Sequence, residues 1–212
     1  MRFTDHFKII NPFKLKNISE KEYSRFDPSI LEAGDNILLE GFFPSYKYFE
    51  DIREVLIKDF LPKQDMNVTN KHSLDKIQNT NSVGVHFRRG DYALTGHHGM
   101  LTKDYYEAAI KQIALKAGPV QLFIFSDEPD WVKENMQFEF LFDVISFNKD
   151  EDSYFDMELM KHCKHNIIAN SSFSWWGAWL NENPDKIVIA PKKWLNLEVD
   201  SMENIPDEWI LL

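Results

Sequence analysis

The chain has 212 residues, of which 24 are Lys or Arg and 34 are Asp or Glu, so its formal net charge is −10. This length fits one large domain or two small ones. An apolar content of 43% and an aromatic content of 14% suffice for a packed core and argue against disorder. The acidic balance argues against a general nucleic-acid or anionic-membrane binder, because both need broad positive charge.

Cysteine content and hydrophobic runs indicate the compartment. Cys163 is the sole cysteine, which excludes an intrachain disulfide and a Cys-based metal site and favours a reducing, cytoplasmic location. The N-terminus lacks the apolar core of a signal peptide. The longest uncharged run, 166–181, is too short and too polar to span a membrane. Its residues Trp175, Trp176 and Trp179 are expected in the core, with peripheral contact at the inner membrane face as the alternative.

The first third of the chain shows little periodicity. Residues 1–45 are expected to be irregular, because short apolar pieces alternate there with Asn, Pro and Gly. A helix is predicted from Tyr46 to Pro62, where apolar residues recur at helical spacing. The polar stretch 62–81 is expected to be a linker or a domain boundary.

From residue 82 onward, predicted strands and helices alternate. Thr102 is placed to cap the first of these helices, and Gly118 and Pro119 to end it. Strand–helix alternation predicts a parallel sheet with right-handed crossovers, so the fold class is α/β. The predicted strands cover 83–88, 120–125, 141–147, 167–169 and 187–190, and the helices begin at Thr102, after Asp127, at Ser153 and at Ser172.

Three polar segments follow predicted strands directly. They are 86–91, 125–128 and 170–174. In open parallel sheets, ligands bind in the crevice beyond the carboxyl ends of the strands. Because all three segments occupy that place, their agreement predicts a binding site there.

The first segment carries two adjacent arginines, Arg88 and Arg89, followed by Gly90 and Asp91. Guanidinium groups match phosphate geometry, so this pair in an acidic protein points to a phosphate or pyrophosphate. A structural ion pair between one arginine and Asp91 is an equally open interpretation.

The other two segments offer anion and hydroxyl contacts. Ser171 and Ser172 lie at the expected start of a helix, where free N–H groups favour an anion, although simple N-capping is the commoner role. Together with the arginine pair they predict a diphosphate site. Asp127 could accept a hydrogen bond from a ribose hydroxyl or a base, or else cap the helix that begins near Pro129.

Other classes of site find little support. His97 and His98 lie in a Gly-flanked loop without a carboxylate or cysteine at ligand spacing, so we expect no metal there and a surface loop or an acceptor contact instead. The Gly-x-Gly-x-x-Gly, Walker and Gly-x-Ser-x-Gly motifs are absent, which removes the usual dehydrogenases, P-loop enzymes and α/β-hydrolases.

Four motifs in order resemble those of one family. Residues 86–92, HFRRGDY, resemble the HxRRGDY motif of the α-1,2-fucosyltransferases of glycosyltransferase family 11. FSDE at 125–128 is similar to the family's FSDD, with Glu128 in place of the second Asp, and 160–180 is similar to its third motif. GFFPSYKYF at 41–49 resembles GYWQSEKYF. The resemblance covers about residues 37–194.

The resemblance implies a GT-B-like fold with a Rossmann-like donor domain. It implies inverting transfer of L-fucose from GDP-β-L-fucose to the 2-hydroxyl of a β-galactoside in an oligosaccharide acceptor, with neither metal nor cofactor. Asp91 is a candidate general base on chemistry alone, or a residue that holds the arginines. By position, the donor contacts implied are Arg88 and Arg89 at the pyrophosphate, His86 and Asp127 near the guanosine, and Ser171, Ser172 and Phe173 around the phosphates.

The sequence departs from the family at its start. The family begins with a strand, a GGLGNQMFQYA segment and a helix, and this chain has no such unit. We therefore expect an incomplete N-terminal, acceptor-side domain over 1–81, a GDP-fucose-binding domain over 82–194 and a tail over 195–212. A non-catalytic remnant that binds GDP-sugar or glycan is the alternative to an active fucosyltransferase.

Overall fold

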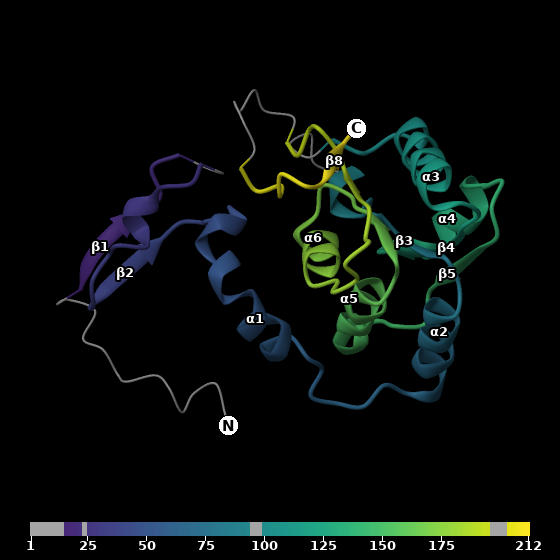
Figure 1. Cartoon of the computed structure of the whole chain (residues 1–212), viewed down its shortest axis with the longest axis horizontal. Helices are drawn as coiled ribbons and strands as arrows, with labels where there is room; N and C mark the ends of the chain where they lie inside the picture. The colour runs from purple at the N-terminus through teal and green to yellow at the C-terminus, as the bar shows by residue number, and fades with distance from the viewer. Residues whose placement is uncertain (1–14, 23–24, 94–98, 196–202) are drawn as a thin grey trace. The chain divides into compact units, whose positions relative to one another are not determined.

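The computed structural model describes residues 15–22, 25–93, 99–195 and 203–212 (Figure 1). They divide into two compact units. The smaller comprises the described part of Met1–Ile52 and Asp200–Pro206, and the larger that of Arg53–Val199 and Asp207–Leu212.

The smaller unit contains a two-stranded parallel sheet. Strand β1 (Lys16–Ser19) pairs with β2 (Ile37–Glu40), and the side chains of Asn17 and Ser19 donate hydrogen bonds to that of Glu40. The expectation that 1–45 is irregular was therefore wrong for these strands, because four residues are too few to show an alternating pattern. Three 3₁₀ turns complete the unit: η3 (Pro28–Ile30), η4 (Tyr46–Tyr48) and η5 (Glu50–Ile52).

The larger unit is built on a six-stranded, fully parallel sheet in the order β5-β4-β3-β6-β7-β8. Renumbered from β3, this is the Rossmann order 3-2-1-4-5-6, whose topological switch point lies between β3 and β6. The α/β prediction is confirmed, and each predicted strand from residue 83 onward has a counterpart, although β6 ends at Ile167, where the predicted strand 167–169 begins. The bounds are β3 (Ser82–Phe87), β4 (Gln121–Ser126), β5 (Phe142–Ile145), β6 (His165–Ile167), β7 (Val188–Ala190) and β8 (Ile210–Leu211).

Six α-helices of the described chain accompany this sheet. The helix predicted from Tyr46 is α-helical only from Arg53, after η4 and η5. Thr102 and Ser153 stand at N-caps as predicted, yet neither side chain makes a capping hydrogen bond. The bounds are α1 (Arg53–Asp59), α2 (Val68–Gln78), α3 (Lys103–Ala117), α4 (Pro129–Asn135), α5 (Tyr154–Lys161) and α6 (Ser172–Trp179), with 3₁₀ turns η6 (Asp91–Ala93) and η7 (Asp150–Asp152).

Alternate residues of the central strands point to opposite faces of the sheet and belong to two separate hydrophobic cores. Val83 and Val85 of β3 pack with the apolar face of α3, whereas Phe123 and Phe125 of β4 pack on the other side with residues of α2 and α5, among them Ile77. Because both faces are covered by helices (Figure 1), the central strands are almost wholly buried.

The expected linker over 62–81 was wrong, because this stretch contains α2. Asn67 caps the helix by accepting a hydrogen bond from the backbone N–H of Asn70 at 2.9 Å. Ile77 is fully buried and Leu74 packs beside it, while the other residues are polar apart from the exposed Val68, so the helical period is weak in the sequence. The larger unit therefore starts at Arg53, and β8 joins its sheet, which differs from the boundaries expected at 82 and 194.

The cap at Asn67 gives a stability prediction. Asn67→Ala leaves the N–H of Asn70 without its acceptor, so the free energy of unfolding should fall by about 1 kcal/mol. Lys71→Ala, on the exposed face of the same helix, should change it by less than about 0.5 kcal/mol. Urea denaturation of both variants measures this, and equal stabilities would contradict the capping role.

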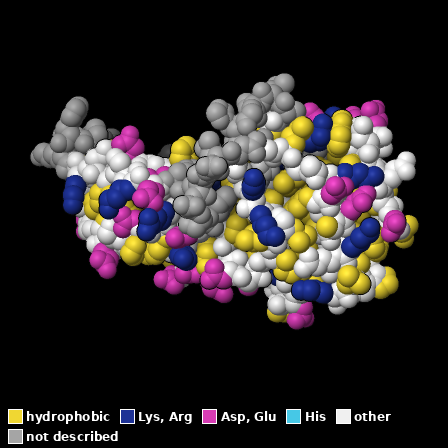
Figure 2. All heavy atoms as spheres, turned by 90° about the horizontal axis from the view of Figure 1, so that it is seen from above, with side chains coloured by type: hydrophobic (Ala, Val, Ile, Leu, Met, Phe, Trp, Pro, Cys, Tyr) yellow, Lys and Arg dark blue, Asp and Glu magenta, His cyan; other side chains and the backbone are white. Residues whose placement is uncertain are grey.

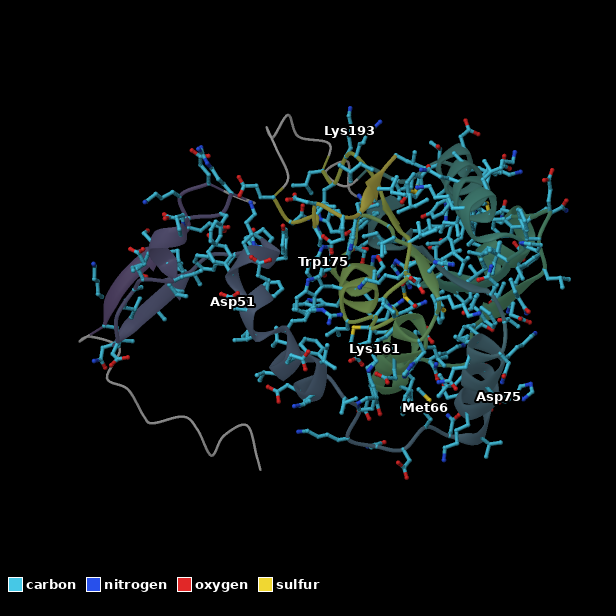
Figure 3. All side chains as sticks on the ribbon, viewed as in Figure 1. Asp51, Met66, Asp75, Lys161, Trp175 and Lys193 are labelled. Atoms are coloured by element: carbon cyan, nitrogen blue, oxygen red, sulfur yellow. The ribbon has the colours of Figure 1, made fainter. Side chains whose placement is uncertain are left out.

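The tryptophans of α6 lie mostly inside. Trp175, labelled in Figure 3, and Trp179 are both buried, which confirms the core prediction for these two. Their rings stack with centroids 5.8 Å apart. Trp176 is half-buried and stacks on Phe60 at 4.8 Å. None of the helices in the described part of the chain is long and apolar enough to cross a membrane.

Candidate functional site

A pocket of about 600 Å³ opens at the carboxyl ends of β3, β4 and β5. It lies where the sequence placed a site, beyond the strand ends of a parallel sheet. The start of α5 and one residue of α6 close it. The lining consists of His86 and Arg88 at the end of β3, 125–131 at the end of β4 and beyond it, Ile145, Ser146 and 148–150 at the end of β5 and beyond it, Ser153 and Asp156 near the start of α5, and Phe173 on α6.

Arg88 stands on the pocket wall between two carboxylates. Its Nη2 lies 2.7 Å from Oδ1 of Asp91, and its Nη1 lies 3.1 Å from Oδ2 of Asp127. The guanidinium also lies over the ring of Tyr92, 5.3 Å from its centroid. The ion pair with Asp91 therefore exists, and it holds a cation that faces the pocket.

Asp127 joins the loops that follow β3 and β4. While Oδ2 pairs with Arg88, Oδ1 accepts a hydrogen bond from the backbone N–H of Arg89 at 3.0 Å. A Cβ at Gly90 would lie only 2.7 Å from Oδ2, so glycine permits this close approach. Both oxygens of Asp127 are thus engaged by the arginine loop.

Arg89 has different surroundings from Arg88 and does not line the pocket. Its Nε donates a hydrogen bond to Oε2 of Glu128 at 3.1 Å. Its guanidinium lies 3.3 Å from the ring centroid of Trp131, a residue of α4. The two arginines expected together at a pyrophosphate are therefore separated.

His86 is buried at the inner end of the pocket. Burial, and to a lesser extent the charge of Arg88, lower its pKa to about 3, so the imidazole is neutral at pH 7. Its ring lies 5.5 Å from that of Phe173, and its buried Nδ1 has no hydrogen-bond partner among the described residues. A neutral imidazole can serve a ligand as donor or as acceptor.

The start of α6 is only partly in this pocket. Phe173 lines it, whereas Ser171 and Ser172 do not. Ser171 is buried at the N-cap without a side-chain capping bond, and Ser172 is exposed. The hydroxyl of Tyr92 donates a hydrogen bond to the carbonyl of Asn170 at 3.1 Å, which ties the arginine loop to this helix start.

The sequence analysis missed a buried polar group in the pocket wall. Burial raises the pKa of Asp156 to about 7, although a hydrogen bond from Asn148 partly offsets the shift. Asn148 donates this bond at 2.7 Å, and its amide also pairs reciprocally with that of Asn70 at 2.8 and 2.9 Å. An aspartate among the apolar residues of the helix predicted from Ser153 was the available signal.

The polar residues outside the pocket give no sign of a metal site in the part of the chain that the structure describes. His97 and His98 lie outside the described residues. Within the described ranges, no three His, Cys, Asp or Glu residues lie together as metal ligands would. Figure 2 shows Lys and Arg side chains scattered among hydrophobic and acidic ones on the described surface seen from above.

Comparisons with known proteins identify the family of the chain. The family model described as glycosyl transferase family 11 matches residues 2–212. The O-antigen biosynthesis glycosyltransferase WbnK of Escherichia coli is 36% identical over 91% of this chain and 66% of its own length. An alpha-1,2-colitosyltransferase of Escherichia coli is 38% identical over 92% of this chain and 68% of its own length.

More distant relatives are mammalian. The galactoside alpha-(1,2)-fucosyltransferase 1 of Aotus azarae is 27% identical over 70% of this chain and 44% of its own length. The chain therefore spans about two thirds of the bacterial relatives and under half of this mammalian one. With a family model that matches nearly its whole length, the chain belongs to glycosyltransferase family 11.

Proposed function

We propose that the chain binds GDP-β-L-fucose in the pocket beside Arg88 and transfers fucose, with inversion, to the 2-hydroxyl of a β-galactoside. The observation that carries the proposal is the position of Arg88: a fixed cation on the wall of a pocket at the sheet's carboxyl end, in a member of family 11. A GT-B arrangement, with the smaller unit on the acceptor side, is part of the same proposal.

The acidic lining suits the nucleoside half of the donor. Carboxylates only accept hydrogen bonds, and guanosine offers donors on its base and on its ribose. Asp156 keeps one oxygen on Asn148 and turns a buried carboxyl toward the pocket, where a base N–H would satisfy it. Among the described residues, the lining carboxylates are Asp127, Glu128, Asp130, Asp150 and Asp156, against the cations Arg88 and Lys149.

Arg88 suits the diphosphate half. In the transfer, the acceptor oxygen forms a bond to the anomeric carbon while the bond from that carbon to GDP breaks, so negative charge develops on the diphosphate. A guanidinium held in place by Asp127 stabilises that charge once the diphosphate has taken the edge that Asp91 occupies in the free protein. The backbone N–H groups at the start of α6 offer a second contact for the same anion.

Asp91 is the carboxylate that we propose as base, since it is exposed and next to Arg88. It would take the proton of the 2-hydroxyl as the new bond forms. In the free protein, however, it occupies an edge of the guanidinium that the diphosphate would use.

This position gives Asp91→Asn two opposite effects. GDP should bind about twofold to fivefold more tightly, because an exposed competing anion is removed from Arg88. Transfer should slow, because the amide cannot take a proton. Calorimetry with GDP and a rate assay measure both, and weaker GDP binding would contradict the competition.

The test of the proposal is a direct assay of transfer. The chain is incubated with GDP-fucose and lactose, and the product is analysed by mass spectrometry and NMR. One added fucose in α-1,2 linkage supports the proposal. GDP binding without product would favour the non-catalytic remnant, and absence of GDP binding would contradict both interpretations.

The identity of the sugar needs its own comparison. Identity to the protein named a colitosyltransferase is 38%, against 27% to the Aotus azarae fucosyltransferase. We therefore include nucleotide-activated colitose as a second donor in the same assay. Faster transfer of colitose than of fucose would support the proposed transfer reaction but identify colitose as the preferred sugar.

A further inference from the structure

We infer that Arg89 is a positioning residue, which sets the wall of the donor pocket, and that Arg88 alone of the adjacent pair contacts the diphosphate. The inference rests on the proposed function. It assigns different roles to Arg88 and Arg89, whereas the resemblance to the family places both at the pyrophosphate.

The polar and aromatic contacts of Arg89 run toward helix α4 and the turn before it. Its Nε is bonded to Glu128, the N-cap residue of α4, and its guanidinium lies on Trp131 one turn further along. Cation–π attraction is strongest for Trp and increases where water is excluded, and the side chain of Arg89 is 20% exposed. Arg89 thus fastens the loop after β3 to α4.

The residues that Arg89 holds are themselves lining residues of the pocket. Glu128 and Trp131 both line it, whereas Arg89 contacts these two residues and does not line it. The backbone N–H of Arg89 also donates a hydrogen bond to Asp127, and Asp127 forms an ion pair with Arg88. Loss of the Arg89 side chain would free the Trp131 ring and leave Glu128 without its ion-pair partner.

A direct phosphate contact by Arg89 would have to come from its Nη atoms alone. Its guanidinium has one face on Trp131 and its Nε on Glu128, whereas Arg88 presents its guanidinium to the pocket. Lysine cannot replace Arg89 in this role, because an ammonium lacks the planar face and the Nε donor.

The two roles predict different patterns of ligand affinity. A residue that contacts the diphosphate strengthens the binding of GDP but not that of guanosine. A residue that shapes the pocket wall strengthens the binding of both equally. We therefore measure the ratio of the guanosine and GDP dissociation constants, by ligand-observed NMR and calorimetry, in the full chain. Thermal unfolding of each variant monitors folding.

Arg89→Ala should weaken guanosine and GDP alike, by about fivefold to tenfold, and leave their ratio within about twofold of the parent. Arg89→Lys should behave like Arg89→Ala. Arg88→Ala should instead lower the ratio by about tenfold or more, with little effect on guanosine. Lys116→Ala, which removes an exposed cation on α3, serves as the charge control and should change neither affinity.

A double-mutant cycle adds a readout that a merely structural role would not move. Arg89→Ala and Trp131→Ala should be non-additive for guanosine affinity, because each removes the same stacked pair. Additive losses would overturn the coupling. If Arg89→Ala collapsed the guanosine-to-GDP ratio as Arg88→Ala does, Arg89 would be a diphosphate ligand and the inference would be wrong.

Failure of the proposed function would look different. A parent chain that binds neither guanosine nor GDP contradicts the donor pocket as a whole. If the parent binds both and the substitution of either arginine by alanine lowers the ratio, only the assignment of different roles to Arg88 and Arg89 is overturned. If Arg89→Ala does not fold, Arg89→Lys and Trp131→Phe, which keep a cation and an aromatic ring, carry the comparison.

Discussion

Arg88→Ala is expected to slow fucose transfer by about 10²–10³-fold, the usual cost of removing one preorganised donor from developing negative charge. Among the described residues, Arg88 is the arginine that lines the pocket, and two carboxylates and an aromatic ring hold it in place. Because that charge grows as the bond to GDP breaks, kcat should fall more than the affinity for the acceptor.

Arg88→Lys is the matched control for charge. It keeps the cation but loses the planar pair of donors, so the rate should lie between those of the parent and Arg88→Ala. Stability should change little, since the partly exposed ion pairs of Arg88 contribute only about 0–1 kcal/mol each. An Arg88→Ala variant that is folded and transfers at the parental rate would refute the assigned role.

The central sheet was readable in the sequence, and the smaller elements were not. β4 contains a continuous apolar run closed by a polar residue, a pattern typical of buried parallel strands, and in β3 the apolar residues alternate before the strand ends at the arginines. The helix α2 hides its one apolar stripe, Leu74 and Ile77, among polar residues. The two-residue strand β8 has no periodicity to detect, and only its pairing with β7 defines it.

The candidate site shows the same limit at the level of side chains. Segments after three strands do converge as predicted, because parallel strands end at one edge of the sheet. The different surroundings of Arg88 and Arg89 arise from Glu128 and Trp131, which contact Arg89 and lie about forty residues further along the chain. Which way each arginine points depends on packing across that distance, and the adjacent pair in the sequence gives no sign of it.

Asp156→Asn is expected to remove a pH dependence of stability that the parent chain carries. The pKa of Asp156 is about 7 in the folded chain, chiefly because of burial, against 3.8 as the ordinary value. Between these pH values the unfolded chain is ionised at this position and the folded chain is protonated. The stability of the parent should therefore fall as the pH rises from 4 to 7.

The size of this effect follows from the pKa difference. At about 1.4 kcal/mol per unit, the loss at pH 8 is about 4 kcal/mol. The amide in the Asp156→Asn variant has no charge to bury, yet its oxygen could still accept the hydrogen bond from Asn148. The variant should thus match the parent near pH 3, below both pKa values, and exceed it at pH 8, as measured by urea denaturation at both pH values. A stability difference that does not depend on pH would contradict the buried titration.

The titration of Asp156 should also govern the affinity for GDP-fucose. Here the Asp156→Asn variant should be at a disadvantage at high pH, whereas in stability it has the advantage there. The ionised carboxylate is the form that accepts from a base N–H, and with a pKa of about 7 its population rises about tenfold between pH 6 and pH 8. Affinity for GDP-fucose should rise about tenfold over that interval in the parent and stay flat in Asp156→Asn. His86 does not compete as an explanation, because its pKa of about 3 keeps it neutral throughout. A carboxyl that destabilises the folded chain at pH 8 but strengthens donor binding there is placed for recognition, since stability alone would favour an amide or an apolar residue at this position.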